Sequence, residues 1–97
     1  MNIRELQSAL EEFIFVGQAR RLGVFDALDE KNDTAAGLAA RMKFDRRATV
    51  ALLDALVEMK YLRKSGTVYS VTPATRRRLV DRAGREYEGD FWSFLMY

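Results

Sequence analysis

The chain has no cysteine and no histidine among its 97 residues. Without cysteine it can form neither a disulfide framework nor a thiolate metal site. Without histidine it lacks both the commonest general base and the commonest metal ligand. The glycine patterns that bind nucleotides, G-x-G-x-x-G and the P-loop, are missing as well. We therefore expect no catalytic, cofactor-binding or metal-binding site in this chain, and no enzymatic activity from it alone.

Proline occurs once and glycine six times, so few residues interrupt helices. A hydrophobic content of 48% and a charged content of 31% are ordinary for a soluble globular chain, and the length suits one small domain over 1–97. The N-terminal "MNIRELQSALEEF" carries acidic residues instead of the apolar core of a signal peptide, and no later run is long enough to cross a membrane. These features predict a cytoplasmic protein without a membrane segment.

Apolar spacing predicts four helices in the first 60 residues. A long helix over 2–22 should stop at Gly23, and a short second helix should follow from Val24. Asp33 or Thr34 can cap a third helix, after which Lys43–Phe44 makes a turn and Asp45 caps a helix over 46–60.

The stretch "YLRKSGTVYSV" predicts a β-hairpin that turns at Ser65–Gly66, where glycine supplies the positive φ of a tight turn. Thr72 and Pro73 then start a C-terminal helical segment, as cap and first helical residue. The predicted fold is mainly α: a winged helix-turn-helix with a long N-terminal helix, a short β-hairpin wing and a C-terminal helical segment.

Two segments carry more apolar surface than one small core can bury. Phe13–Val16 places large apolar groups all round the first helix, because successive helical residues are about 100° apart. The chain also ends on "FWSFLMY", although chain ends are usually polar. Either a second chain covers these segments, or the first helix is a crowded core helix and the end folds back on its own core.

Basic residues suggest an alternative, a small dimeric winged-helix DNA-binding regulator. Its candidate nucleic-acid contacts are Arg46, Arg47, Arg76, Arg77 and Arg78. However, acidic side chains share the outward face of helix 46–60 with the first two arginines, and consecutive arginines point in different directions around a helix. An ordinary charged solvent face therefore explains these residues better than DNA binding.

As a set, "ARRLGVFDALDE" and "TAAGLAARMKFDRRATVALLDALVEMKYLRKSGTVYSVTPATRRRLV" resemble the N-terminal winged-helix dimerisation domain of class I SAM-dependent O-methyltransferases. Members include plant phenolic, hydroxyindole and bacterial antibiotic-pathway enzymes. The resemblance covers roughly residues 10–95. Its matching features include Gly23–Leu28, Leu52–Leu56 and Thr72–Pro73.

This resemblance implies a homodimer whose first helix and post-hairpin stretch clasp the partner. The implied interface residues are Leu10, Phe13, Ile14, Phe15, Val16, Phe91, Trp92, Phe94 and Leu95. Phe13 and Phe15 would also form part of the wall of the partner's substrate pocket.

The resemblance also implies S-adenosylmethionine as the cofactor of the full-length enzyme and a small molecule as its substrate. In the family, the glycine motif for the cofactor and the catalytic histidine lie in a later Rossmann-like domain, and nothing in this chain corresponds to them. We therefore interpret the chain as the front part of a longer enzyme, or as a stand-alone relic of one.

Overall fold

Helix α1 (Ile3–Arg21) begins at a reciprocal cap. The Asn2 side chain accepts a hydrogen bond from the backbone N–H of Glu5 at 2.8 Å, and the Glu5 carboxylate accepts one from the Asn2 N–H at 3.3 Å. Two residues after the helix, Gly23 has φ +83°, a left-handed conformation that glycine adopts without steric cost. The computed structural model, which describes residues 2–89, thus confirms the predicted long helix and its glycine stop.

Three shorter helices follow: α2 (Val24–Glu30), α3 (Ala35–Met42) and α4 (Arg46–Glu58). Thr34 caps α3, because its hydroxyl accepts from the Gly37 N–H at 3.0 Å, and Asp45 caps α4 by accepting from the Ala48 N–H at 2.8 Å. Asp33, the other candidate cap, accepts instead from Nε of Arg41 at 3.0 Å. The predicted order of helix, turn and helix is therefore present in α3 and α4.

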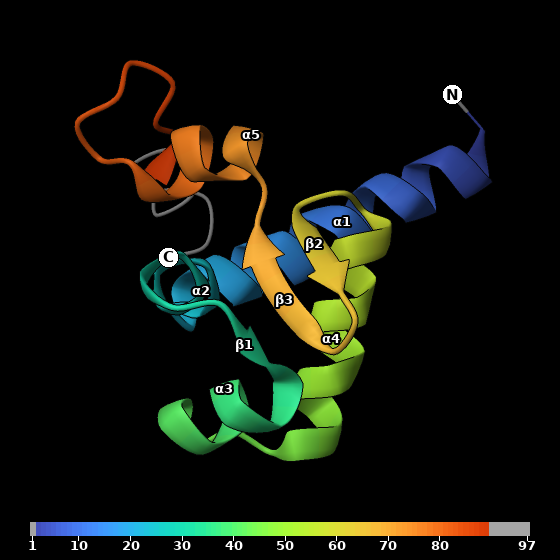
Figure 1. Cartoon of the computed structure of the whole chain (residues 1–97). Coiled ribbons are helices and arrows are strands. Elements are labelled where there is room, and N and C mark those ends of the chain that lie inside the picture. The colour runs from blue at the N-terminus through green and yellow to red at the C-terminus, as the bar shows by residue number, and fades with distance from the viewer. Residues whose placement is uncertain (1, 90–97) are drawn as a thin grey trace.

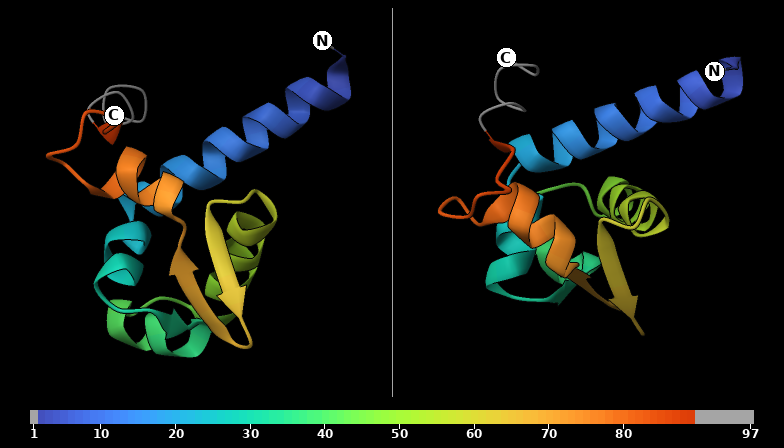
Figure 2. Two further views of the ribbon diagram at one scale, coloured as in Figure 1. Left: turned by 45° about the horizontal axis from the view of Figure 1, so that its top comes forward. Right: turned by 90° about the horizontal axis from the view of Figure 1, so that it is seen from above.

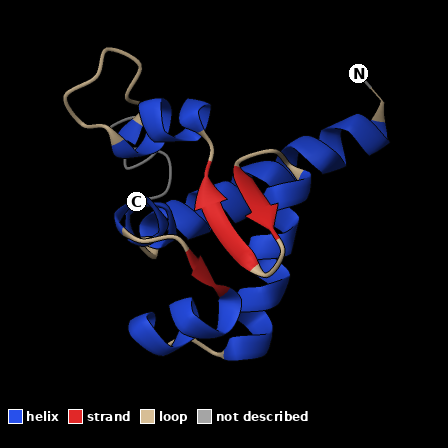
Figure 3. Ribbon diagram, in the orientation of Figure 1, coloured by secondary structure: helices blue, strands red, loops and turns tan. Residues whose placement is uncertain are grey.

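The strands form a small antiparallel sheet in the order β1-β3-β2, with helices around it (Figure 3). Strands β2 (Leu62–Ser65) and β3 (Val68–Val71) are the predicted hairpin. The predicted turn position was wrong by one residue: Ser65 pairs with Val68, so the loop is residues 66–67 with Gly66 at φ +62°. Strand β1 (Asp33–Thr34) was not predicted, because two residues are too short to show alternation.

The chain after the hairpin is helical over residues 73–80, as predicted. Thr72 caps the short helix α5 (Pro73–Thr75), which has proline in its first turn, and α5 runs directly into η1 (Arg76–Val80), a π-type helical turn. The π-type geometry was not predicted, since a single wide turn leaves no mark in apolar spacing.

One hydrophobic core joins helices α1 to α4, the hairpin and η1. Its large, fully buried side chains are Phe25, Leu28, Leu38, Leu53, Leu56, Val16 and Val24. From α1 only the C-terminal half reaches this core, through Val16, Gly17 and Ala19. The N-terminal half of α1 projects beyond the body of the chain in every view (Figures 1 and 2). The C-terminal half of α1 is thus packed on the core, whereas its N-terminal half is available for contact with another molecule.

Candidate dimer interface

Four large aliphatic side chains lie in a row on α1 and stay exposed. Ile3, Leu6, Leu10 and Ile14, here called the α1 stripe, are 83%, 49%, 54% and 53% exposed. Their spacings of three and four residues keep them within an arc of about 80° on one side of the helix. Single exposed aliphatic residues are ordinary, whereas a continuous row on a projecting helix is typical of a surface that another chain covers.

Phe13 lies directly beside the stripe, about 20° around the helix from Leu6, whereas Phe15 lies about 100° from Ile14. Phe13 is half-buried and packs against the chain's own core. Phe15 is 37% exposed and lines a groove of about 380 Å³ between α1 and α4, together with Ala55, Met59 and the polar residues Ser8, Glu11, Glu12 and Glu58. Of the two candidate wall residues, Phe15 therefore lines a hollow that another molecule could enter, and Phe13 packs against the core.

Val16 is buried and is therefore not a dimer-interface residue in this structure. Its side chain is 0% exposed within the chain's own core, so no surface of it remains for a partner. The C-terminal candidates Phe91, Trp92, Phe94 and Leu95 lie outside the described residues. Ile3 and Leu6 are exposed as well, although neither was among the predicted interface residues. Their exposure depends on where the core meets the helix, which helical periodicity alone does not reveal.

A partly buried hydrogen bond helps to fix the angle at which α1 leaves the body. The Tyr61 hydroxyl, just before β2, donates to the Glu12 carboxylate at 2.8 Å. Burial of the ring, together with the neighbouring Glu12 carboxylate, raises the pKa of Tyr61 to about 12. The hydroxyl therefore stays protonated at neutral pH and can donate this bond. Because it links residues 12 and 61, it holds the middle of α1 against the hairpin end of the core.

The outward face of α4 is tied to the hairpin by Asp54. The Asp54 carboxylate accepts hydrogen bonds from the buried Tyr69 hydroxyl and, at 3.4 Å, from Nζ of Lys64. Lys64 also lies 5.0 Å from the centre of the Tyr69 ring. The hydrogen bond from Tyr69, aided by that from Lys64, lowers the pKa of Asp54 below its ordinary value. This cluster joins α4 to both strands of the hairpin and places an ionised carboxylate on the face that a DNA-binding helix would present.

This carboxylate should make stability depend on pH. Because the folded-state pKa of Asp54 is depressed, its stabilisation is present above the ordinary pKa of 3.8 and is lost as the pH falls through the lower folded value. We expect Asp54→Asn to cost about 1 kcal/mol at neutral pH, a modest figure because the carboxylate is about half exposed. In thermal melts, the difference in melting temperature between the unmutated chain and Asp54→Asn should be smaller at about pH 2 than at pH 7. An equal difference at both pH values would contradict this role. Tyr69→Phe should reduce the dependence of the melting temperature on pH.

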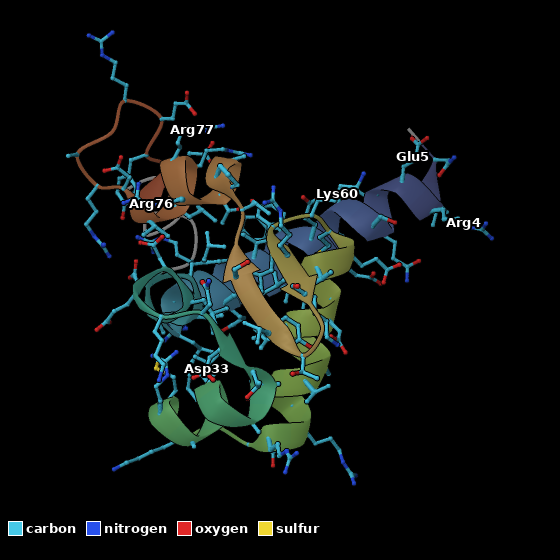
Figure 4. All side chains as sticks on the ribbon, viewed as in Figure 1. Arg4, Glu5, Asp33, Lys60, Arg76 and Arg77 are labelled. Atoms are coloured by element: carbon cyan, nitrogen blue, oxygen red, sulfur yellow. The ribbon has the colours of Figure 1, made fainter. Side chains whose placement is uncertain are left out.

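The arginines of the C-terminal segment pair with acidic residues of the same chain. Nε of Arg76 lies 3.1 Å from Asp29, Nε of Arg77 lies 3.2 Å from Glu86, and Nε of Arg78 lies 2.9 Å from Glu88. Figure 4 shows Arg76 and Arg77 at the α5 end of the molecule. These pairs are half exposed and add little stability, yet they neutralise the charge that a phosphate would meet. The other candidates, Arg46 and Arg47, are exposed at the start of α4.

The described residues form neither a Rossmann-type cofactor site nor a cluster of potential metal ligands. Dinucleotide-type cofactor sites are built on a parallel sheet, with a glycine-rich turn leading into a helix N-terminus. The sheet here is antiparallel, with three short strands, and the part of the chain that is described contains no cluster of three potential metal ligands. None of its helices is long and apolar enough to cross a bilayer.

The fold has close structural counterparts. PigF with SAH superposes with a TM-score of 0.85 at 24% sequence identity over 99% of this chain. An O-methyltransferase family 2 protein from Planctomyces limnophilus, in complex with apigenin, superposes with a TM-score of 0.81 at 27% identity over 92% of this chain. Human N-acetylserotonin methyltransferase in complex with SAM superposes with a TM-score of 0.74 at 23% identity over 96% of this chain. The chain spans 29%, 27% and 29% of these three structures, respectively. No curated protein matches in sequence.

The family model of the O-methyltransferase dimerisation domain matches residues 15–81, more than half of the chain. The matched region covers the core, from the anchored half of α1 to the end of η1. The fold and this match agree: the chain belongs to the O-methyltransferase dimerisation domain family.

Proposed function

We propose that this chain forms a homodimer that supports a SAM-dependent O-methyltransferase acting on a small molecule in the cytoplasm. The observation that carries the proposal is the exposed α1 stripe on a domain of the dimerisation family. Structural counterparts complexed with SAH, SAM or apigenin support the choice of cofactor and the small-molecule substrate. In this proposal α3, α4 and the hairpin act as a winged-helix scaffold, and methyl transfer takes place on a domain that these 97 residues do not include.

Light scattering on the purified chain tests the homodimer. At micromolar concentration we expect twice the monomer mass of 11.2 kDa. A monodisperse 11.2 kDa particle would refute the proposed homodimer.

The intact mass of the gene product in its own cells tests the proposed methyltransferase activity. We expect a mass well above 11.2 kDa and methyl transfer from SAM. A product of 11.2 kDa would remove the methyltransferase role.

A contribution to the substrate pocket belongs to the same proposal. Phe15 is its candidate, because its ring is partly exposed in the groove between α1 and α4. Phe13 is the weaker candidate, since it packs against the core of its own chain.

DNA binding has no comparable support. Ion pairs within the chain engage Arg76, Arg77 and Arg78, and Asp54 stands on the outward face of α4. We expect no electrophoretic shift of duplex DNA at low salt, where phosphate contacts are strongest. A shift that weakens steeply as salt rises would restore the regulator hypothesis.

A further inference from the structure

We propose that two copies of this chain join through their α1 stripes, antiparallel about a two-fold axis. In this register Ile3 lies opposite the partner's Ile14, and Leu6 lies opposite the partner's Leu10. The inference rests on the proposed homodimer and adds its geometry. The family match begins at residue 15, so it does not itself define what residues 3–14 contact.

The stripe is suited to pairing with itself. A two-fold contact brings the same patch of both chains together, so each residue must find a complement within that patch. The exposed side chains of Ile3, Leu6, Leu10 and Ile14 are all aliphatic and nearly evenly spaced. When one stripe is turned end to end against another, the two outer residues meet and the two inner residues meet, which leaves no stripe residue without an apolar neighbour.

Charge favours the antiparallel direction. Arg4 and Glu11 are exposed and two helical turns apart, and helical geometry places them on the same flank of the stripe. In an antiparallel pair Arg4 comes beside the partner's Glu11, twice per dimer. In a parallel two-fold pair the two copies of this flank lie on opposite sides of the contact, so Arg4 and the partner's Glu11 do not meet. Figure 4 shows Arg4 on the projecting half of α1.

The shape of the chain favours the same direction. The body of the domain is attached to the C-terminal half of α1, whereas the stripe lies mainly on the projecting half (Figure 2). An antiparallel pair puts the two bodies at opposite ends of the paired helices. A parallel pair would place both bodies at the same end, where they compete for space.

Disulfide trapping tests the register directly, because the chain has no cysteine of its own. Ile3→Cys and Ile14→Cys chains are prepared separately, mixed, mildly oxidised and run on a non-reducing gel. We expect a cross-linked heterodimer from the mixture and none from either variant alone. In this register the two copies of residue 3 are on the order of 16 Å apart along the helices, far beyond the reach of a disulfide. Leu6→Cys mixed with Leu10→Cys gives a second pair with the same expectation.

Charge reversal gives an independent measurement. Arg4→Glu or Glu11→Arg should each weaken the dimer roughly tenfold, because each puts like charges together twice per dimer. The double variant should restore most of the affinity. Both residues are exposed in the single chain, so its folding, followed by circular dichroism, should change little.

The outcomes separate this inference from the proposed function. Cross-linking of Ile3→Cys with itself would overturn the antiparallel register. A chain that scatters as a dimer but gives neither heterodimer would also overturn it, and the proposed homodimer would then stand through another surface. A monomeric unmutated chain would overturn both.

Discussion

Leu10→Asp is expected to convert the dimer into a monomer at micromolar concentration. Leu10 is 54% exposed in the single chain and lies in the middle of the α1 stripe. An unpaired carboxylate buried between two helices costs roughly 3 kcal/mol or more, and each dimer would contain two of them. The dissociation constant should therefore rise by more than about a hundredfold. Sedimentation or light scattering over a concentration series measures the change directly.

Val50→Asp is the matched control for this substitution. Val50 is also an exposed aliphatic residue on a helix, 38% exposed, but it lies on α4 outside the stripe. Its replacement should leave the dimer intact. Equal dissociation constants for Leu10→Asp and the unmutated chain would show that the stripe is not the interface. Both variants should unfold as cooperatively as the unmutated chain, because neither side chain belongs to the core.

Phe25→Ala should have the largest effect on stability of any single truncation in the core. Phe25 is the largest of the fully buried side chains, 1% exposed, and its ring centre lies 6.4 Å from that of Tyr61. Truncation leaves a cavity where α2 meets the rest of the core, at a cost of roughly 3–5 kcal/mol. That is a large share of the 5–15 kcal/mol that typically holds a domain folded. Circular dichroism during urea or thermal unfolding should show a much weakened or absent transition.

Phe25→Leu provides the comparison, because it keeps an apolar group of intermediate size in the same place. We expect the stability of Phe25→Leu to lie between that of the unmutated chain and that of Phe25→Ala. If Phe25→Ala unfolded at the same denaturant concentration as Phe25→Leu, the ring would not be part of a tightly packed core.

Local chemistry was predictable wherever a few neighbouring residues decide it. Asp45 caps α4 and Gly23 ends the turn after α1, since a side-chain oxygen or a missing Cβ acts within one helical turn. Leu53 and Leu56 are buried on one side of α4, in agreement with helical spacing, because one helix presents one face to one core.

Features that join distant segments were missed. The two-residue strand β1 exists only because β3 lies beside it, and the hydrogen bond from Tyr69 to Asp54 links residues fifteen positions apart. Neither has a local signal. The arginines of η1 looked like a basic cluster in sequence, but the fold brings Asp29 to Arg76 and Glu88 to Arg78, so their charge is largely compensated.

The amino-acid sequence by itself determined the main helices, the hairpin, the helix caps and the surplus of apolar residues in α1, because these depend on periodicity and on contacts within a turn. The tertiary structure alone decided which of those apolar residues remain available to a partner. It buries Val16 and leaves Ile3, Leu6, Leu10 and Ile14 exposed. The reason is geometric: a helix longer than the core it packs on must extend past it, and only the packing of α2, α4 and the hairpin sets where the core ends.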